Sequence, residues 1–238
     1  MDVNATRFKS LVILTGAGIS AESGIRTFRA ADGLWENHRI EDVASPEGYL
    51  RNPGLVQEFY NQRRRQLQDG AVQPNPGHKA LARLEQEWEG GFLLITQNVD
   101  NLHERAGSRR MVHMHGELQS VFCQGCDARV RWVDDLSPTD VCSACQAVGR
   151  LRPDIVWFGE MPYHMEAIGE ALAGCELFVS IGTSGVVYPA AGFAREAFQA
   201  RRIEVNLQGT DISSLFHEHR RGPAGTEVIK LVDELLGN

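Results

Sequence analysis

Residues 11–24 read LVILTGAGISAESG, and this stretch is the main indication of the fold class in the sequence. Its four leading apolar residues predict a short buried strand, and the residues SAE further on can open a helix. Between them, Gly16, Gly18 and Ala21 match the G-x-G-x-x-G/A spacing of a dinucleotide-binding loop. Residues without bulky side chains let backbone N–H groups approach a pyrophosphate at a helix N-terminus. A structural strand–turn–helix corner would give the same short pattern, so the remaining chain must decide between the two.

The composition of the 238 residues is that of a soluble globular protein, with 42% hydrophobic and 23% charged residues. A formal net charge of −7 argues against a nucleic-acid-binding surface covering the protein, so we expect no nucleic-acid partner. The first nine residues lack the apolar core of a signal peptide, and no apolar run approaches the length of a membrane span. We therefore expect a cytoplasmic protein that does not associate with a membrane.

Strands and helices alternate along the chain, which predicts a parallel sheet flanked by helices. The predicted extended segments are 11–14, 92–96, 111–115, 153–158, 177–181 and 203–207. The predicted helices are 53–68, 78–88, 102–106, 167–173, 190–200 and 227–236. Polar residues directly follow the strand 92–96, and open α/β sheets bind ligands at the carboxyl ends of their strands.

Residues 25–45 show no periodic apolar pattern, and we predict a long loop there. An ordinary dinucleotide-binding fold would place its second strand in this region, ending in an acidic residue about 20 positions on. The chain is therefore not a standard dehydrogenase half. A long loop rich in arginine, aspartate and aromatic residues beside a phosphate loop could cover a cofactor.

The predicted helix 53–68 carries an arginine within its apolar face. On a helical wheel Arg63 falls in the middle of the apolar arc, whereas Arg64 and Arg65 point away from it. One interpretation is that Arg63 extends to solvent along the edge of the face. The other is that Tyr60 and Arg63, one turn apart, face a pocket and bind an anionic group.

Four of the five cysteines form two closely spaced pairs that are typical of a zinc site. Cys123 and Cys126 are followed, after fifteen intervening residues, by Cys142 and Cys145. Four thiolates fill the tetrahedral coordination sphere of Zn²⁺ and leave no open position, so we predict one structural zinc ion. Cys175 stands apart and is predicted to be a buried core thiol.

Several motifs together resemble the sirtuin family, in the family's order and over nearly the whole chain. They are Gly16-Ala17-Gly18-Ile19-Ser20, Thr27-Phe28-Arg29, Gln97-Asn98-Val99-Asp100, His113-Met114-His115-Gly116, the four paired cysteines and Gly182-Thr183-Ser184. In particular the chain resembles bacterial CobB-type sirtuins of the subgroup that removes acidic acyl groups, whose Tyr-x-x-Arg pair is matched here by Tyr60 and Arg63.

This resemblance implies an α/β fold in which a Rossmann-like parallel sheet, flanked by helices, binds NAD and carries an inserted small structural-zinc domain. The implied NAD-binding domain comprises residues 1–30, 80–118 and 152–238. Residues 31–79 would form the cofactor loop and the helical part of the small domain, and residues 119–151 its four-cysteine zinc part.

The resemblance further implies NAD-dependent lysine deacylation of acyl-lysine-bearing proteins by a monomer, with acetyl, succinyl and malonyl groups removed. The products would be nicotinamide and 2′-O-acyl-ADP-ribose. In this chemistry a general base draws a proton from the ribose hydroxyls, a role that suits histidine because its pKa lies near neutrality. His115, in the His-Gly pair, is the implied base. We expect His113, two residues earlier on an extended strand, to point to the opposite face and to be structural.

The resemblance also assigns the remaining site residues. Asn98 and Asp100 would join His115 in catalysis by holding the nicotinamide carboxamide, and Phe28 would shield the reacting ribose from water. Val156, Phe158 and Gly159 match a segment that pairs with substrate backbone as an added strand, and Tyr60 and Arg63 match the pair that binds an acyl carboxylate. The implied cofactor contacts are Gly16, Ala17, Gly18, Glu22, Thr27, Phe28, Arg29, Trp35, Gln97, Asn98, Val99, Asp100, Gly182, Thr183, Ser184, Asn206, Leu207, Gln208 and Ala224.

Two other functions fit parts of the sequence. The same NAD chemistry could serve mono-ADP-ribosyl transfer onto proteins. A non-enzymatic zinc-knuckle module that recognises nucleic acid or protein would explain the cysteines alone, although the acidic balance weighs against nucleic acid.

Overall fold

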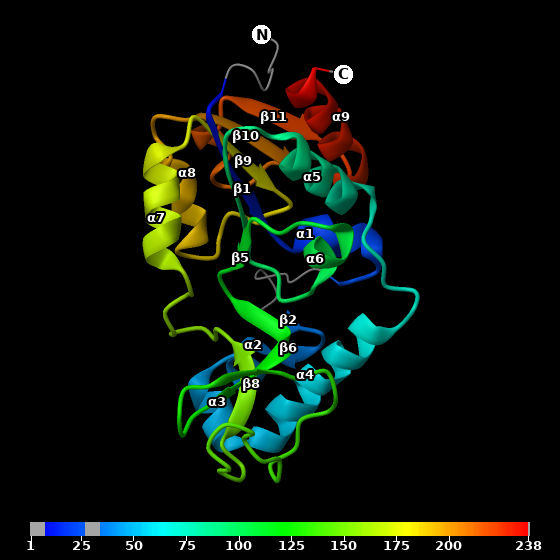
Figure 1. The fold of residues 1–238 in the computed structure, drawn as a ribbon, viewed down its shortest axis with the longest axis vertical. Helices are drawn as coiled ribbons and strands as arrows, with labels where there is room; N and C mark the ends of the chain where they lie inside the picture. Colours follow the sequence, from blue (N-terminus) through cyan, green and yellow to red (C-terminus); the bar gives the residue numbers. More distant parts are fainter. Residues whose placement is uncertain (1–7, 27–33, 238) are drawn as a thin grey trace.

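The computed structural model describes residues 8–26 and 34–237, which form a larger and a smaller lobe (Figure 1). The larger lobe is built on a six-stranded sheet in the order β11-β10-β9-β1-β4-β5, and every neighbouring pair is parallel. Its strands are β1 (Ser10–Thr15), β4 (Gly91–Thr96), β5 (Met111–His113), β9 (Leu177–Ile181), β10 (Arg201–Asn206) and β11 (Glu218–Arg221). The predicted parallel sheet is confirmed.

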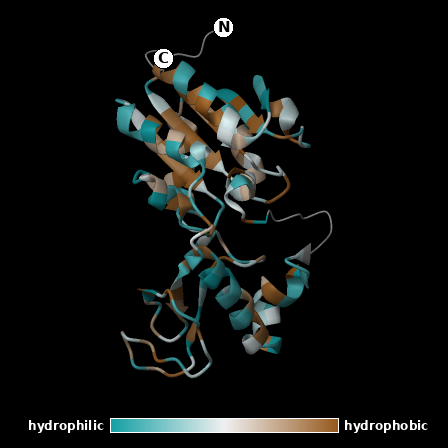
Figure 2. Ribbon diagram, turned by 90° about the vertical axis from the view of Figure 1, so that its right-hand side faces the viewer, coloured by the Kyte–Doolittle hydropathy of each residue, from teal (hydrophilic) through white to brown (hydrophobic). Residues whose placement is uncertain are grey.

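Strand β1 lies at the centre of this sheet and is buried on both faces. Leu11 and Ile13 pack into one hydrophobic cluster, whereas Val12 and Leu14 pack into another on the opposite face. A parallel strand covered on both sides needs an unbroken apolar run rather than an alternating pattern. In Figure 2 the central strands of the larger lobe are accordingly mostly hydrophobic.

Helices cover both faces of the large sheet. Helices α5 (Pro76–Glu87) and α9 (Ala224–Leu236) pack against the face that holds Leu11, and α7 (Met165–Gly174) covers the other face together with η4 (Ala190–Gly192) and α8 (Phe193–Glu196). The single helix predicted for 190–200 is wrong, because the segment divides into a 3₁₀ turn and a short α-helix at Gly192, a poor helix former. Within the described ranges, no helix is long and apolar enough to cross a bilayer.

The smaller lobe combines short helices with two small antiparallel sheets. Its elements are β2 (Leu34–Trp35), β3 (His38–Arg39), α2 (Ile40–Val43), α3 (Pro46–Arg51), α4 (Pro53–Gln68), β6 (Gly116–Cys123), β7 (Arg129–Arg131) and β8 (Leu151–Ile155). One buried cluster joins α4 to β6 and β8, and a second surrounds two of the paired cysteines. Three further short elements lie in the larger lobe, namely α1 (Ala17–Ser20), η2 (Ala21–Ser23) and α6 (Leu102–Ala106), and η5 (Ser213–Leu215) precedes β11.

Three helices begin with the same local chemistry, a polar N-cap residue followed by proline. Asn52 and Asn75 accept hydrogen bonds from Leu55 N and Gly77 N at the starts of α4 and α5, at 3.1 and 2.9 Å. Ser45 accepts one from Gly48 N at the start of α3. Proline fits the first helical position because its missing N–H would have no partner there.

The predicted loop 25–45 is wrong in part. Its described portion contains the two-stranded hairpin β2–β3 and helix α2, whereas residues 27–33 lie outside the described residues. An ordinary dinucleotide-binding fold would have its second strand in this part of the sequence. Here the strand that pairs with β1 is β4, which comes later in the chain because helices α2–α4 are inserted before it. In the sheet, β4 and β5 follow β1 on one side, and β9, β10 and β11 extend from β1 on the other side. The order in which the chain adds strands therefore reverses between β1 and β9, which is the topological switch point.

The loops that leave β1 and β9 touch at this switch point. A Cβ atom on Gly18 would lie 2.6 Å from Gly182 Cα and 2.7 Å from its carbonyl oxygen. Gly16 N and Gly18 N donate to Ile181 O and Gly182 O, at 3.0 and 2.9 Å. The glycines of the opening motif are therefore required by backbone packing.

We expect Gly18→Ala to lower the free energy of unfolding by about 1–3 kcal/mol, because the new methyl group meets fixed backbone. Gly169→Ala is the matched control, since this helix residue has open space around its Cβ position, and it should be neutral or stabilising by up to about 1 kcal/mol. Urea unfolding measures both. Equal effects of the two substitutions would contradict the packing argument.

Candidate active site

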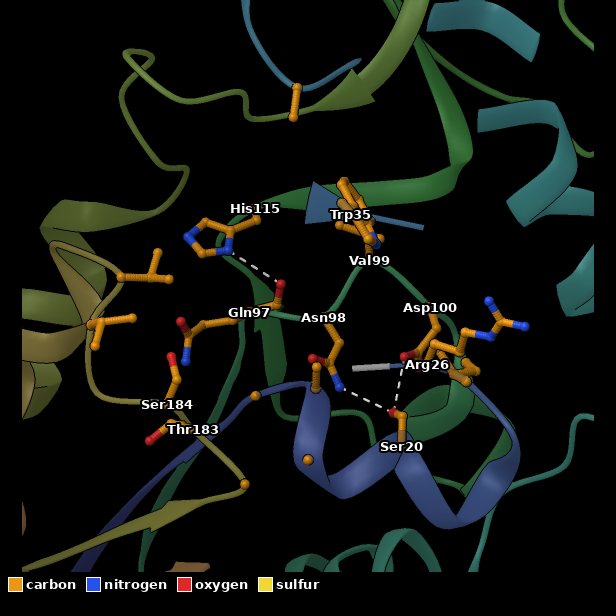
Figure 3. A pocket seen from close by; sticks show the side chains of 18 of the residues that line it. Ser20, Arg26, Trp35, Gln97, Asn98, Val99, Asp100, His115, Thr183 and Ser184 are labelled. Atoms are coloured by element: carbon orange, nitrogen blue, oxygen red, sulfur yellow. Dashed lines mark hydrogen bonds between the residues drawn. The ribbon is translucent and has the colours of Figure 1, made fainter. Parts of the chain in front are cut away.

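A cavity of about 860 Å³ lies between the carboxyl ends of the large sheet and the smaller lobe. The loops after β1, β4, β9 and β10 line one side, and helix α4 with the segment after β8 lines the other. Figure 3 shows lining residues from the loops after β4 and β9, together with His115. The predicted residues that line it are Gly16, Ala17, Gly18, Trp35, Tyr60, Arg63, Gln97, Asn98, Val99, Asp100, His115, Val156, Phe158, Gly159, Gly182, Thr183, Ser184, Asn206, Leu207 and Gln208. The structure thus brings together residues from nearly the whole length of the chain.

A few predicted contacts lie elsewhere. Glu22 and Ala224 do not line the cavity, and the Glu22 carboxylate instead accepts a hydrogen bond of 2.6 Å from Gly225 N in the first turn of α9. Thr27, Phe28 and Arg29 lie outside the described residues.

The segment after β4 is held by a buried hydrogen-bond chain (Figure 3). Asn98 Nδ2 donates to Ser20 Oγ at 3.1 Å, and Ser20 Oγ donates to Asp100 Oδ2 at 3.0 Å. The other carboxylate oxygen of Asp100 accepts from Leu102 N at 3.0 Å. Burial raises the pKa of Asp100, against the opposing effect of these hydrogen bonds. Ser20 was not among the predicted contacts, although its place directly after the glycine loop would have pointed to it.

The imidazole of His115 has a defined tautomer. Its Nδ1 lies 3.2 Å from Gln97 O, and because a carbonyl only accepts, Nδ1 carries the proton. The opposite nitrogen, Nε2, is therefore an acceptor on a side chain that lines the cavity. Burial lowers the pKa of His115, so the ring is neutral at pH 7.

His113 lies away from the cavity, as predicted. Its Nδ1 donates to Asn98 O at 2.9 Å, its Nε2 lies 2.5 Å from Glu104 Oε1, and it does not line the cavity. Burial lowers the pKa of His113, but the hydrogen bonds and the charge of Glu104 outweigh it, so the pKa is raised overall. The reason given for this prediction was wrong, because residues two apart on a continuous strand share a face. Strand β5 instead ends at His113, and a turn at 114–115 gives His115 a different direction.

Helix α4 presents Tyr60 and Arg63 to the cavity. Tyr60 is fully buried, and its hydroxyl accepts a hydrogen bond of 3.1 Å from Trp157 Nε1. The Arg63 guanidinium lies 3.6 Å from the centre of the Phe59 ring and donates to Phe59 O at 2.6 Å. Its buried Nε has no hydrogen-bond acceptor among the described residues. Burial lowers the pKa of Arg63, partly offset by the charge of Glu36.

Arg64, predicted to point away from the apolar arc, does not reach the surface. Arg64 is fully buried and donates from Nε to Leu118 O at 2.7 Å and from Nη1 to Asn61 Oδ1 at 2.6 Å. Helix α4 packs against β6 as well as against its apolar neighbours, so two of its faces are covered. Arg65 is exposed, as predicted, and pairs with Glu58 and Asp135.

The segment after β8 is tied down along one edge. Val156 N donates to His115 O at 2.9 Å and Phe158 N donates to Ala44 O at 3.0 Å. Gly159 has a φ of +92°, and its N–H makes no hydrogen bond within the described part of the chain. Phe158 is 49% exposed at the cavity mouth. Among the lining residues that were not predicted from the sequence are Arg26, Glu36, Tyr188, Thr210 and Asp211.

The four paired cysteines fit a tetrahedral ion. Their sulfurs all lie within 4.8 Å of one another, with Cys123 Sγ 3.7 Å from Cys145 Sγ and Cys126 Sγ 3.8 Å from Cys142 Sγ. Four thiolates at about 2.3 Å from one zinc ion would be about 3.8 Å apart. Cys175 is buried apart from them and donates to Leu172 O.

Residues 16–189 match the model of the Sir2 family. This chain belongs to the Sir2 family. An NAD-dependent protein deacylase of Bdellovibrio bacteriovorus is 62% identical over 96% of the chain and 97% of its own length. Among solved structures, the complex of a Sir2 homologue with NAD is 38% identical, with a TM-score of 0.86 over 96% of this chain and 90% of that one. Sir2Af2 bound to a myristoylated histone peptide is 32% identical, with a TM-score of 0.74 over 97% and 92%.

We expect the purified protein to carry about one zinc ion per chain and Cys142→Ser to carry almost none, since removing one of four ligands leaves the ion exposed to exchange. Cys175→Ser is the matched control and should keep the full zinc content. Elemental analysis and thermal melting before and after chelation measure the effect. Loss of zinc from both variants alike would contradict the four-cysteine assignment.

Proposed function

We propose that this Sir2-family chain is an NAD-dependent protein-lysine deacylase that removes acetyl and acidic acyl groups and releases nicotinamide and 2′-O-acyl-ADP-ribose. The observation that carries the proposal is the neutral His115, whose Nε2 is an acceptor on a side chain that lines a cavity formed by the loops after β1, β4 and β9. The named relative is a deacylase, and solved relatives hold NAD or an acylated histone peptide.

In the proposed reaction NAD supplies an activated ribose carbon for attack by the acyl oxygen. His115 Nε2 then accepts a proton from a ribose hydroxyl, and the Nδ1–H bond to Gln97 O holds the ring in the accepting tautomer. Because burial keeps the imidazole neutral, the base is available without prior loss of a proton.

The residues around the glycine loop bind and orient NAD. Asn98 and Asp100 position the nicotinamide end, and the chain Asn98–Ser20–Asp100 fixes their side chains before the cofactor enters. The loops after β9 and β10 take the adenosine end, where Asn206 Nδ2 donates to Thr183 O at 2.6 Å and joins the two loops. The roles of Thr27, Phe28, Arg29, Glu22 and Ala224 stay predictions.

The acyl group would lie against α4. Tyr60 and Arg63 offer a hydroxyl and a guanidinium at one end of the cavity, and a guanidinium suits a carboxylate because it can donate charge-assisted hydrogen bonds to it. The segment Val156–Gly159 would pair with the peptide backbone beside the lysine, and the Gly159 N–H, which makes no hydrogen bond among the described residues, could take part.

Incubation of acetyl-, succinyl- and malonyl-lysine peptides with NAD should give the deacylated peptide, nicotinamide and 2′-O-acyl-ADP-ribose, followed by mass spectrometry. His115→Ala should lower the rate by about 10²–10⁴-fold because the general base is lost, while the fold is retained. ADP-ribose attached covalently to a protein, with no deacylated product, would instead support the ADP-ribosyl transfer that the sequence left open.

Arg63→Met should lower kcat/KM for succinyl-lysine peptides by about 10–100-fold, the loss of a charge-assisted hydrogen bond of about 1.5–3 kcal/mol. Deacetylation should change little, since an acetyl group offers no carboxylate. Arg65→Met, on the exposed face of the same helix, is the control and should leave both activities unchanged. Equal loss of both activities in Arg63→Met would rule out a carboxylate-binding role.

A further inference from the structure

The hairpin β2–β3 places a carboxylate inside the cavity, next to Arg63. Glu36 lies at the tip of this hairpin and lines the cavity, although the sequence analysis gave it no role. Its φ is +50° and that of Asn37 is +66°, so both turn residues adopt the left-handed conformation. Asparagine suits that conformation, whereas glutamate is uncommon there.

The hairpin is anchored directly to the helix that carries Arg63. The Trp35 ring packs edge-on against Phe59 at 5.0 Å and against Tyr60 at 5.9 Å, measured between ring centres. His38, on the second strand, packs edge-on against the same Phe59 ring at 5.3 Å. These contacts fix the hairpin tip over the part of α4 where Arg63 emerges.

The charges at this end of the cavity form a chain of three. Glu36 Oε2 lies 3.9 Å from Arg63 Nη2 and 3.2 Å from Arg26 Nη1. The side chains of Glu36 and Arg63 are 18% and 12% exposed, whereas Arg26 is 74% exposed. The carboxylate therefore sits between a buried cation that faces the acyl site and a surface cation beside it.

We propose that Glu36 determines acyl specificity by acting as an internal competitor of acidic acyl groups for Arg63. This role rests on the proposed deacylase function. An incoming succinyl or malonyl carboxylate must share Arg63 with the Glu36 carboxylate or displace it, and like charges in a partly buried site repel. A neutral acetyl group pays no such penalty, so Glu36 shifts the preference of the site toward acetyl-lysine.

Arg26 gives the displaced carboxylate a second partner. The Arg26 guanidinium is mostly exposed and is already closer to Glu36 than Arg63 is. The Glu36 side chain can therefore turn away from Arg63 and keep Arg26 as its counter-ion. Acidic acyl groups are thus admitted at a cost rather than excluded.

The test compares Glu36→Gln with the unsubstituted protein, using succinyl-lysine and acetyl-lysine peptides of identical sequence and saturating NAD. The isosteric change removes only the charge, so kcat/KM for the succinyl peptide should rise by about threefold to tenfold while that for the acetyl peptide stays within about twofold. Glu58→Gln is the matched control, because Glu58 is an exposed carboxylate on α4 that pairs with Arg65. It should leave the ratio of the two activities unchanged.

Glu36→Asn, a second neutral variant that suits the left-handed turn, should change the ratio in the same direction, and thermal melting shows that both variants fold. An unchanged ratio in both folded variants would overturn the competitor role. A fall in succinyl turnover would also overturn it, since Glu36 would then be orienting Arg63. Absence of turnover of either peptide by the unsubstituted protein would instead defeat the proposed function, and this role with it.

Discussion

The backbone contact between Gly18 and Gly182 is the constraint on which the site depends. Gly18 N donates to Gly182 O, and neither residue has room for a Cβ atom. The contact joins the loops after β1 and β9, the two strands between which the sheet changes direction. Because the loops meet without side chains between them, the cavity above them is lined by backbone and by the short polar residues that follow, Ser20 on one side and Thr183 on the other. A bulky residue at either glycine would separate the two halves of the sheet edge.

Local sequence patterns were enough to predict helices and strands whose buried residues recur at regular spacing along the chain. The bounds predicted for α4, α6 and β9 agree with the structure, because apolar spacing and proline at the helix start are local signals. Strand β11 was missed because its four residues, EHRR, are polar. It is an edge strand whose charges pair with residues far away in the sequence, such as Glu218 with Arg201 and Arg220 with Glu234. No pattern within the segment itself reports those partners.

The site was predictable where strand ends or cysteine spacing define it, and less so where packing between distant segments does. Strand ends predicted Gln97 and Asn98, and the spacing of the cysteines predicted four sulfurs close enough to share one ion. The burial of Arg64 was not predictable, because its acceptor Leu118 O comes from a strand 54 residues later. The placement of Glu36 depends likewise on the packing of Trp35 against α4, within a segment that the sequence had suggested was a loop.

Burial has opposite consequences for the two cationic side-chain types in this cavity. It lowers the pKa of both His115 and Arg63. The ordinary pKa of histidine lies near 6.5, so a lowered value leaves the imidazole neutral at pH 7 and able to accept a proton. The ordinary pKa of arginine is 12.5, and a guanidinium whose pKa is lowered from there by partial burial stays charged. The same cavity thus holds a neutral imidazole that can accept a proton and a guanidinium that stays charged. The same low exposure strengthens the interaction of that cation with any carboxylate nearby, whether it belongs to a substrate or to Glu36. Under the proposed function, acyl preference therefore depends on which carboxylate pairs with Arg63, and the neutral state of His115 is unaffected by that choice.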